Sequence, residues 1–256
     1  MAGFFGFFNF DTPGPGVRKD EPKPKGLKKF FGPYFTYFWR ISLCGIWYWL
    51  ISIPVLTAGL ASAGMTNVTR NISVGGYSFG SSDFFETIKK NWKQSLLVGI
   101  INTIITALLI FDIGYFYVLS KASNSMLFCL VGIAVLFAVF SMVKFYVWNI
   151  VITFKLKTKD IYFNAFRFVF LGIKNNLLTV LSLVCYYALF VAAYFLPIPG
   201  LQWAIYFILL LIFPGFKYYA ISFNAFPIIK QYMIDPYYKE HPDEDIGLRT
   251  SLHIMD

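Results

Sequence analysis

A few ionisable and amide side chains stand inside long apolar runs of this sequence. Asp112 and Lys144 are the ionisable ones, and Asn102 is an amide in the same run as Asp112. Charged groups are costly in hydrocarbon, so inside a membrane they usually face the interior of a helix bundle or a water-filled cavity. These three residues are therefore the first candidates for a polar intramembrane site.

Depth in the membrane decides which of these side chains can meet. At 1.5 Å per helical residue, Asp112 lies about 24 Å from the inner end of its expected helix, whereas Lys144 lies about 10–15 Å from that side. This difference argues against an Asp112–Lys144 ion pair. It matches Lys144 in depth to Asn102, unless the lysine extends toward the inner interface. The alternative for both ionisable groups is a side chain satisfied at a membrane interface.

Further polar residues lie near the expected inner face, namely Asn67, Arg70, Asn149 and Lys217. They either line a polar inner pocket or hydrogen-bond to the ends of helices. The sequence alone leaves both readings open.

The motifs of common enzymes are not found in the chain. It has no glycine-rich phosphate loop followed by Lys-Ser or Lys-Thr, no GxSxG and no HExxH, and its histidines are His241 and His253. The cysteines Cys44, Cys129 and Cys185 stand singly in apolar runs, which is typical of small core residues. We therefore expect no enzymatic activity, no catalytic residue, no metal and no cofactor.

The composition indicates where such a chain resides. It is 57% hydrophobic and 14% charged, whereas soluble domains have about 25% charged residues. Its apolar residues form runs of about 20, the length that crosses a bilayer. The net charge of +9 comes from bases that flank these runs, which is typical of cytoplasmic loops and does not indicate a nucleic-acid partner. The prediction is an all-α, polytopic transmembrane helix bundle whose partner is the lipid bilayer.

Four membrane spans are plain in the sequence, at residues 96–119, 126–154, 177–196 and 201–223. Two amphipathic segments, 82–94 and 160–176, mix Phe and Ile with Lys or Arg at helical spacing. They are predicted to be elbow helices in the cytoplasmic interface.

The stretch 33–73 is harder to assign. A single crossing would place the later basic loops outside, whereas two crossings at 33–53 and 54–73 keep the bases inside throughout. Pro54 and Thr57 mark the turn between them, and Gly59 and Gly64 allow close packing of the second helix inside the bundle. The prediction is six crossings as three helical hairpins. The alternative for 54–73 is a short re-entrant or interfacial segment.

This pattern divides the chain into a cytoplasmic Pro/Gly/Lys-rich segment 1–29, one transmembrane domain 30–234 and an acidic cytoplasmic tail 235–256. The predicted location is the plasma membrane, with both termini in the cytoplasm.

One resemblance adds to this reading. The break Ser52-Ile53-Pro54-Val55-Leu56-Thr57-Ala58-Gly59, followed by small residues and Arg70-Asn71, resembles the PVVTIG-type signature of the YesL-like family of bacterial membrane proteins. Residues 8–22 resemble the leader of its clostridial members, and residues 83–94 also fit. The resemblance implies a Gram-positive integral membrane protein of poorly defined activity, encoded near sugar-uptake and polysaccharide-utilisation genes. It supplies no catalytic or binding residue.

Two functions follow as expectations. The first is a non-enzymatic accessory protein for carbohydrate uptake that contacts subunits of an ABC-type sugar permease. The alternative is a small membrane transporter or substrate-binding membrane subunit. Its site would lie near Asn102, Lys144 and residues 54–64, so a water-accessible cavity at that place would favour it. The oligomeric state does not follow from the sequence.

Overall fold

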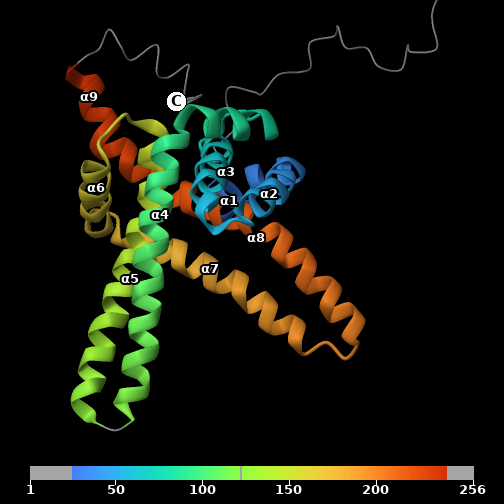
Figure 1. Cartoon of the computed structure of the whole chain (residues 1–256). Helices are drawn as coiled ribbons and strands as arrows, with labels where there is room; N and C mark the ends of the chain where they lie inside the picture. Colours follow the sequence, from blue (N-terminus) through green and yellow to red (C-terminus); the bar gives the residue numbers. More distant parts are fainter. Residues whose placement is uncertain (1–24, 122, 241–256) are drawn as a thin grey trace, which may run out of the picture.

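The computed structural model describes residues 25–121 and 123–240, and every regular element in these ranges is a helix (Figure 1). This confirms the predicted all-α class. The first 24 residues and residues 241–256, which include most of the predicted terminal segments, lie outside the described residues. In chain order the elements are α1 (Leu27–Thr36), α2 (Phe38–Ser52), the 3₁₀ turn η1 (Val55–Thr57), α3 (Ala58–Ser73), α4 (Ser81–Ser120), α5 (Asn124–Thr153), α6 (Thr158–Leu171), α7 (Ile173–Tyr194), α8 (Pro199–Ile229), the π-helical turn η2 (Lys230–Ile234) and α9 (Asp235–Glu240).

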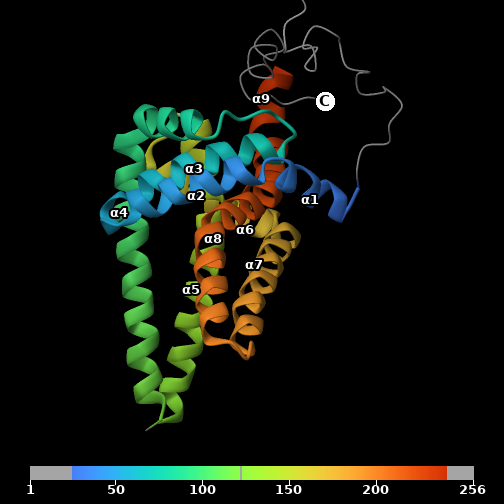
Figure 2. The ribbon, with the colours of Figure 1, turned by 90° about the vertical axis from the view of Figure 1, so that its right-hand side faces the viewer.

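Two long helix pairs, α4–α5 and α7–α8, extend in the same direction, and their connecting turns lie at the end opposite α9 (Figures 1 and 2). Within the described ranges, four helical segments are long and apolar enough to cross a membrane: α4, α5, α7 and Gly200–Glu240, which starts in α8. At most 33% of the most apolar window of each is buried inside the protein. Their apolar side chains therefore face outward, which indicates a membrane protein. The four plain spans predicted from the sequence fall on these helices.

The hairpin formed by α2, η1 and α3 lies across the long helices (Figure 2). Its helices have 15 and 16 residues, or about 23–24 Å each, which is short of about 30 Å of hydrocarbon. The six predicted crossings are therefore not confirmed, because 33–53 divides into α1 and α2 at Tyr37 and neither α2 nor α3 has spanning length. The geometry matches the re-entrant or interfacial alternative.

α4 is one continuous helix of 40 residues, although the sequence predicts an elbow at 82–94 separate from a span at 96–119. No glycine or proline occurs between Ser81 and Val98, so nothing interrupts the helical hydrogen bonding. The first turns nevertheless lie across the direction of the rest of the helix, as an elbow would (Figure 2). The second predicted elbow is mostly α6, and residues 173–176 belong to α7.

The bend of α8 is supported by α2. Pro214 lies inside α8, and its nitrogen has no hydrogen to donate to the carbonyl of Leu210, four residues earlier. The indole Nε1 of Trp49 donates to that carbonyl instead, at 2.9 Å. A Cβ on Gly45 would lie 2.9 Å from the next carbonyl oxygen, that of Leu211. The two helices thus approach closely because Gly45 has no side chain.

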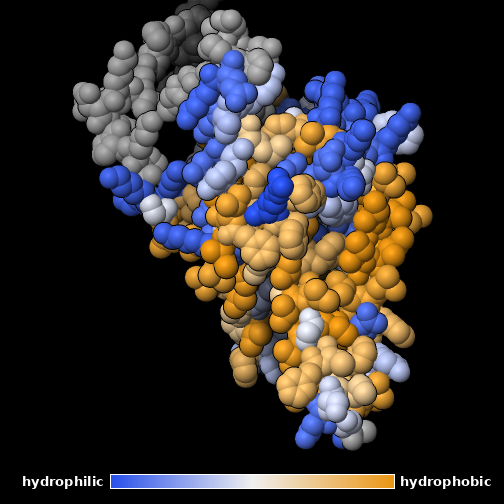
Figure 3. Space-filling model, turned by 90° about the vertical axis from the view of Figure 1, so that its left-hand side faces the viewer, coloured by the Kyte–Doolittle hydropathy of each residue, from blue (hydrophilic) through white to orange (hydrophobic). Residues whose placement is uncertain are grey.

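The densest packing surrounds α3, where 12 of 16 residues are buried. α3 packs against α2, α4, α5 and α8, so it joins the two long hairpins. Away from α3 the long helices expose a broad hydrophobic belt, and hydrophilic side chains gather at the end with the α5–α6 connection (Figure 3). Each long helix therefore has one part that packs into the protein core near α3 and another part whose apolar side chains form the exposed belt.

Candidate functional site

A cavity of about 490 Å³ lies where α3 meets α4, α5 and α8. We call it the central cavity. Its walls include Tyr48 of α2, Gly59 and Ser62 of α3, Gly99, Asn102, Thr103 and Thr106 of α4, Ser141, Lys144, Phe145 and Trp148 of α5, and Lys217 and Tyr218 of α8. The volume is in the range of small-molecule sites, about 300–1,000 Å³.

Two lysines bring positive charge to this cavity, and no aspartate or glutamate is among its described lining residues. The Nζ atom of Lys144 donates to the hydroxyl of Thr106 at 3.2 Å. The Nζ atom of Lys217 lies 5.2 Å from the ring centroid of Tyr218. Neither ammonium has a carboxylate beside it in the cavity, so the site favours an anionic or strongly electron-rich ligand.

Asn102 lines the same cavity and has one hydrogen-bonding group without a partner among the described residues. Its side chain is 7% exposed, and its Oδ1 accepts a 2.9 Å hydrogen bond from the hydroxyl of Tyr162. Its Nδ2 is buried and has no hydrogen-bond partner among the described residues. A buried amide donor without a partner costs free energy.

Hydroxyl groups and aromatic rings form much of the remaining wall. Tyr218 donates to Ser62 Oγ at 2.6 Å, and Ser62 in turn donates to the carbonyl of Ala58 at 2.7 Å. The rings of Tyr48 and Trp148 also line the cavity. Hydroxyls beside aromatic faces suit a polar solute that also has C–H faces.

Close packing of glycines joins α3 to α4 beside the cavity. A Cβ on Gly59 would lie 2.6 Å from the Cα of Gly99, and the reverse distance is the same. Further along α3, a Cβ on Gly64 would lie 2.9 Å from Cδ2 of Phe84. The turn before α3 is extended at Pro54, and the hydroxyl of Thr57 lies 2.8 Å from the carbonyl of Pro54.

Arg70 and Asn67 lie in a separate network, away from the central cavity. Arg70 Nη1 donates to Thr153 Oγ1, and its Nη2 donates to Asn67 Oδ1, both at 2.8 Å. Asn67 Nδ2 donates to Thr87 Oγ1 at 2.8 Å. Burial lowers the pKa of Arg70 to about 10, which leaves the guanidinium protonated at neutral pH. The partners in these hydrogen bonds are neutral side chains.

The structure thus divides the polar residues that the sequence singles out. Asn102, Lys144 and Lys217 line the central cavity, whereas Arg70 and Asn67 belong to the separate network. Asn149 is fully buried, donates to the carbonyl of Phe145 and leaves its Oδ1 without a partner among the described residues. Asp112 is half-buried on α4, outside the cavity lining and not paired with Lys144.

Several lining residues are missing from the sequence-based candidates. On α4, Gly99, Thr103 and Thr106 share one helical face with the candidate Asn102, and on α5, Ser141, Phe145 and Trp148 share one with the candidate Lys144. The α4 stripe of small or polar side chains in an apolar helix was visible in the sequence. Tyr162 gives no such signal, because it lies 60 residues from Asn102 and the two meet through tertiary packing.

Comparison with known protein families gives a match over part of the chain. The model of a family described as "Protein of unknown function, DUF624" matches residues 41–113. This region comprises most of α2, all of α3 and most of α4, and it supplies one wall of the central cavity. No curated protein and no solved structure matches the chain.

Proposed function

We propose that this chain is a non-enzymatic, multi-pass membrane protein that binds a small anionic solute in the central cavity. The observation that supports this most strongly is that Lys144 and Lys217 both line one cavity whose described lining residues include no carboxylate. Both side chains are cationic hydrogen-bond donors. A carboxylate or phosphate is the ligand chemistry that satisfies both.

The rest of the wall favours a sugar as the body of that solute. Hydroxyls from Ser62, Thr103 and Thr106 can bind sugar hydroxyls, and the ring of Trp148 can pack against a sugar face. The resemblance to the YesL-like family independently favours carbohydrate uptake. A sugar acid combines both features, so glucuronate is a suitable probe and glucose its neutral counterpart.

Calorimetric titration of the purified full-length protein in lipid nanodiscs tests this proposal. Glucuronate should bind at least about tenfold more tightly than glucose, because a charge-assisted hydrogen bond contributes about 1.5–3 kcal/mol. Lys144→Met and Lys217→Met should each remove most of this preference. Lys121→Met, which changes an exposed lysine in the α4–α5 turn, should not. Equal affinity for the two sugars, or an unchanged preference in both cavity variants, would refute an anion site.

A role as an accessory to an ABC-type sugar permease is the second candidate. It is supported by the resemblance to the YesL-like family, and it is compatible with solute binding. Its test is affinity purification from cells grown on the sugars that induce the importer. If permease subunits are never retained above the level of an unrelated membrane protein, this role is wrong.

We further propose a topology of four crossings in the plasma membrane, with both termini in the cytoplasm and the α2–α3 hairpin re-entrant. Single cysteines on a cysteine-free background test it by labelling of intact cells with a membrane-impermeant maleimide. Positions 123 and 200, in or next to the turns of the long hairpins, should label from outside, and position 79 should not. Position 56, in the α2–α3 turn, distinguishes the models, because labelling from outside there would support six crossings.

A further inference from the structure

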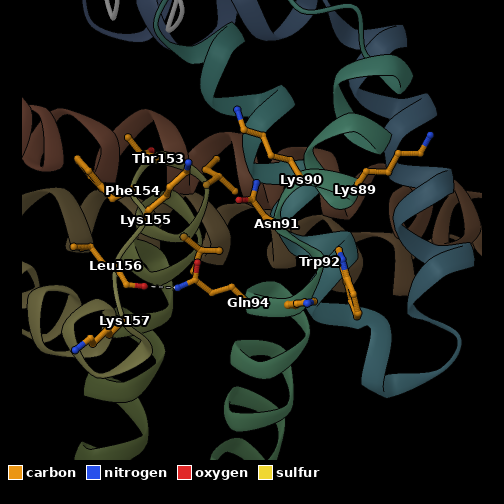
Figure 4. A pocket seen from close by; sticks show the side chains of 13 residues that line it. Lys89, Lys90, Asn91, Trp92, Gln94, Thr153, Phe154, Lys155, Leu156 and Lys157 are labelled. Carbon is orange, nitrogen blue, oxygen red and sulfur yellow. Dashed lines mark hydrogen bonds between the residues drawn. The ribbon is translucent and has the colours of Figure 1, made fainter. Parts of the chain in front are cut away.

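A second hollow, distinct from the central cavity, lies between the first part of α4 and the end of α5. Its volume is about 570 Å³, and it is lined by residues 89–94 and 151–157 (Figure 4). We call it the basic hollow. Gln94 Nε2 donates to the carbonyl of Leu156 at 2.6 Å, which holds the α5–α6 connection against α4. The hollow is therefore formed by two segments that a side-chain hydrogen bond keeps together.

The charged side chains that line the basic hollow are all positive. Lys89, Lys90, Lys93, Lys155 and Lys157 are among its lining residues, and no aspartate or glutamate is among them. Figure 4 shows Lys155 pointing up toward the end of Lys90, with Asn91 beside them, whereas Lys89 and Lys157 point away from the hollow. Two ammonium groups and one amide thus surround the same space from α4 and from the α5–α6 connection.

A buried cation lies behind the wall. Thr153 lines the hollow, and its hydroxyl accepts a 2.8 Å hydrogen bond from Arg70 Nη1. Arg70 is 5% exposed, and its hydrogen-bond acceptors are the neutral side chains of Thr153, Asn67 and Asn71. An uncompensated buried guanidinium adds to the positive potential at this wall, which favours an anion in the hollow.

The position of the hollow indicates the source of that anion. It lies beside the α5–α6 connection (Figure 1), at the end of the molecule where hydrophilic side chains gather (Figure 3). Trp92, which also lines it, is 50% exposed, and tryptophan is enriched at the headgroup level of membranes. Lipid phosphates occupy this level, and basic pockets at helix ends bind the headgroups of anionic lipids.

We infer that the basic hollow binds the phosphate group of an anionic lipid headgroup, with Lys90 and Lys155 as its direct contacts. Asn91 donates a further hydrogen bond, and Arg70 acts through the wall. This site is separate from the central cavity, so it does not depend on the proposed solute.

Native mass spectrometry of the detergent-solubilised full-length protein, titrated with phosphatidylglycerol, tests the inference. Diffuse surface attraction contributes about fivefold in affinity per lysine, whereas direct contact with phosphate contributes about tenfold or more. Lys90→Gln/Lys155→Gln should therefore weaken binding by at least about a hundredfold. Lys89→Gln/Lys157→Gln removes the same charge from side chains that point away, and should weaken it by at most about twenty-five-fold.

Two further arms keep the result interpretable if a variant folds poorly. Phosphatidylcholine should be retained equally weakly by all variants, and a thermal scan should show unfolding of the two double variants at similar temperatures. Glycerol 3-phosphate at millimolar concentration should not displace phosphatidylglycerol from the unmodified protein. Equal losses in the two double variants, or no preference for phosphatidylglycerol over phosphatidylcholine, would overturn the site. Displacement by glycerol 3-phosphate would overturn the lipid as its source.

Discussion

Gly59→Ala tests the contact between α3 and α4 most directly. A Cβ on Gly59 would lie 2.6 Å from the Cα of Gly99 and closer still to the carbonyl oxygen of Ser95. Both neighbours are backbone atoms, so no change of side-chain rotamer can relieve the clash. The two helices must therefore move apart at the point where α3 joins the long hairpins.

The expected cost follows from this geometry. Ordinary contact begins at 3.4 Å, so the helices must separate by most of an ångström. Overpacking of this kind costs about 1–3 kcal/mol. Alanine recovers about 0.5–1 kcal/mol relative to glycine inside a helix. The net loss should be about 0.5–2 kcal/mol, which lowers the Tm of a chain of this size by about 1–8 °C.

The assay is thermal unfolding of the full-length protein in detergent, followed by tryptophan fluorescence. Gly114→Ala in α4 and Gly132→Ala in α5 are matched controls, because a Cβ at either position has no heavy atom within 4 Å. Both controls should leave the Tm unchanged or raise it slightly, since only the helix propensity changes.

A Tm of Gly59→Ala equal to that of the Gly114→Ala control would refute the close contact. The double variant Gly59→Ala/Gly99→Ala adds a second criterion. Once the helices have separated for the first methyl group, the second should cost less than it does alone. Strictly additive losses would show that the two glycines do not face each other.

Three other substitutions have expected effects on the same assay. Tyr146→Phe removes the 2.7 Å hydrogen bond to Asn176 Oδ1, and the buried amide oxygen left behind should cost about 1–3 kcal/mol. Arg70→Lys should cost about 1–3 kcal/mol, because one ammonium cannot replace a guanidinium that binds Thr153 and two asparagines at once. Gly75→Ala should cost about 1–2 kcal/mol from backbone strain at φ 82° alone, since a Cβ there meets no atom within 4 Å.

Each of these expectations has its own control. Tyr115→Phe, at a residue that is 54% exposed, should leave the Tm unchanged, and a Tyr146→Phe variant that behaves the same would contradict the buried hydrogen bond. Arg70→Lys as stable as the unmodified protein would contradict the three-acceptor network. Gly75→Asn should be milder than Gly75→Ala, because asparagine tolerates positive φ; the reverse order would argue against strain.

The distribution of lysines explains what the sequence could and could not predict about topology. Bases flank the ends of the long hairpins near α9, at residues 89–93 and 155–174, and are nearly missing from the turns at 120–125 and 195–201. This pattern requires an even number of crossings before Lys89. Two and none are both even, so charge alone cannot distinguish a spanning first hairpin from a re-entrant one.

The lengths of α1 and α2 also could not be predicted from the local sequence. Residues 33–53 are apolar enough to span, but Tyr37 separates α1 from α2, and α2 ends at Ser52 before Pro54. The orientation of α2 depends on contacts far along the chain, such as the bond from Trp49 to Leu210. Hydropathy indicates whether a segment prefers lipid or water, but it does not indicate which distant residues the segment contacts.

Residues of the candidate site could be predicted from the sequence where a polar side chain stands in an apolar run, because such a side chain costs free energy in hydrocarbon. Asn102 and Lys144 are conspicuous because polar groups are rare inside apolar runs, and both line the central cavity. Tyr218 is inconspicuous in an aromatic-rich chain, and its role depends on Ser62, which lies 156 residues away. Helical periodicity predicts which residues are neighbours within one helix, but it does not predict contacts between residues of different helices, such as Tyr218 and Ser62.

The hydrogen bond from Trp49 to Leu210 has a consequence for the biogenesis of the protein. It joins residues 161 positions apart, so α2 is synthesised long before α8 leaves the ribosome. Until the two meet, the carbonyl freed by Pro214 has no partner in hydrocarbon, where an unsatisfied polar group costs several kcal/mol. The α7–α8 pair therefore depends on the beginning of the chain for the hydrogen bond that completes the bend of its last long helix.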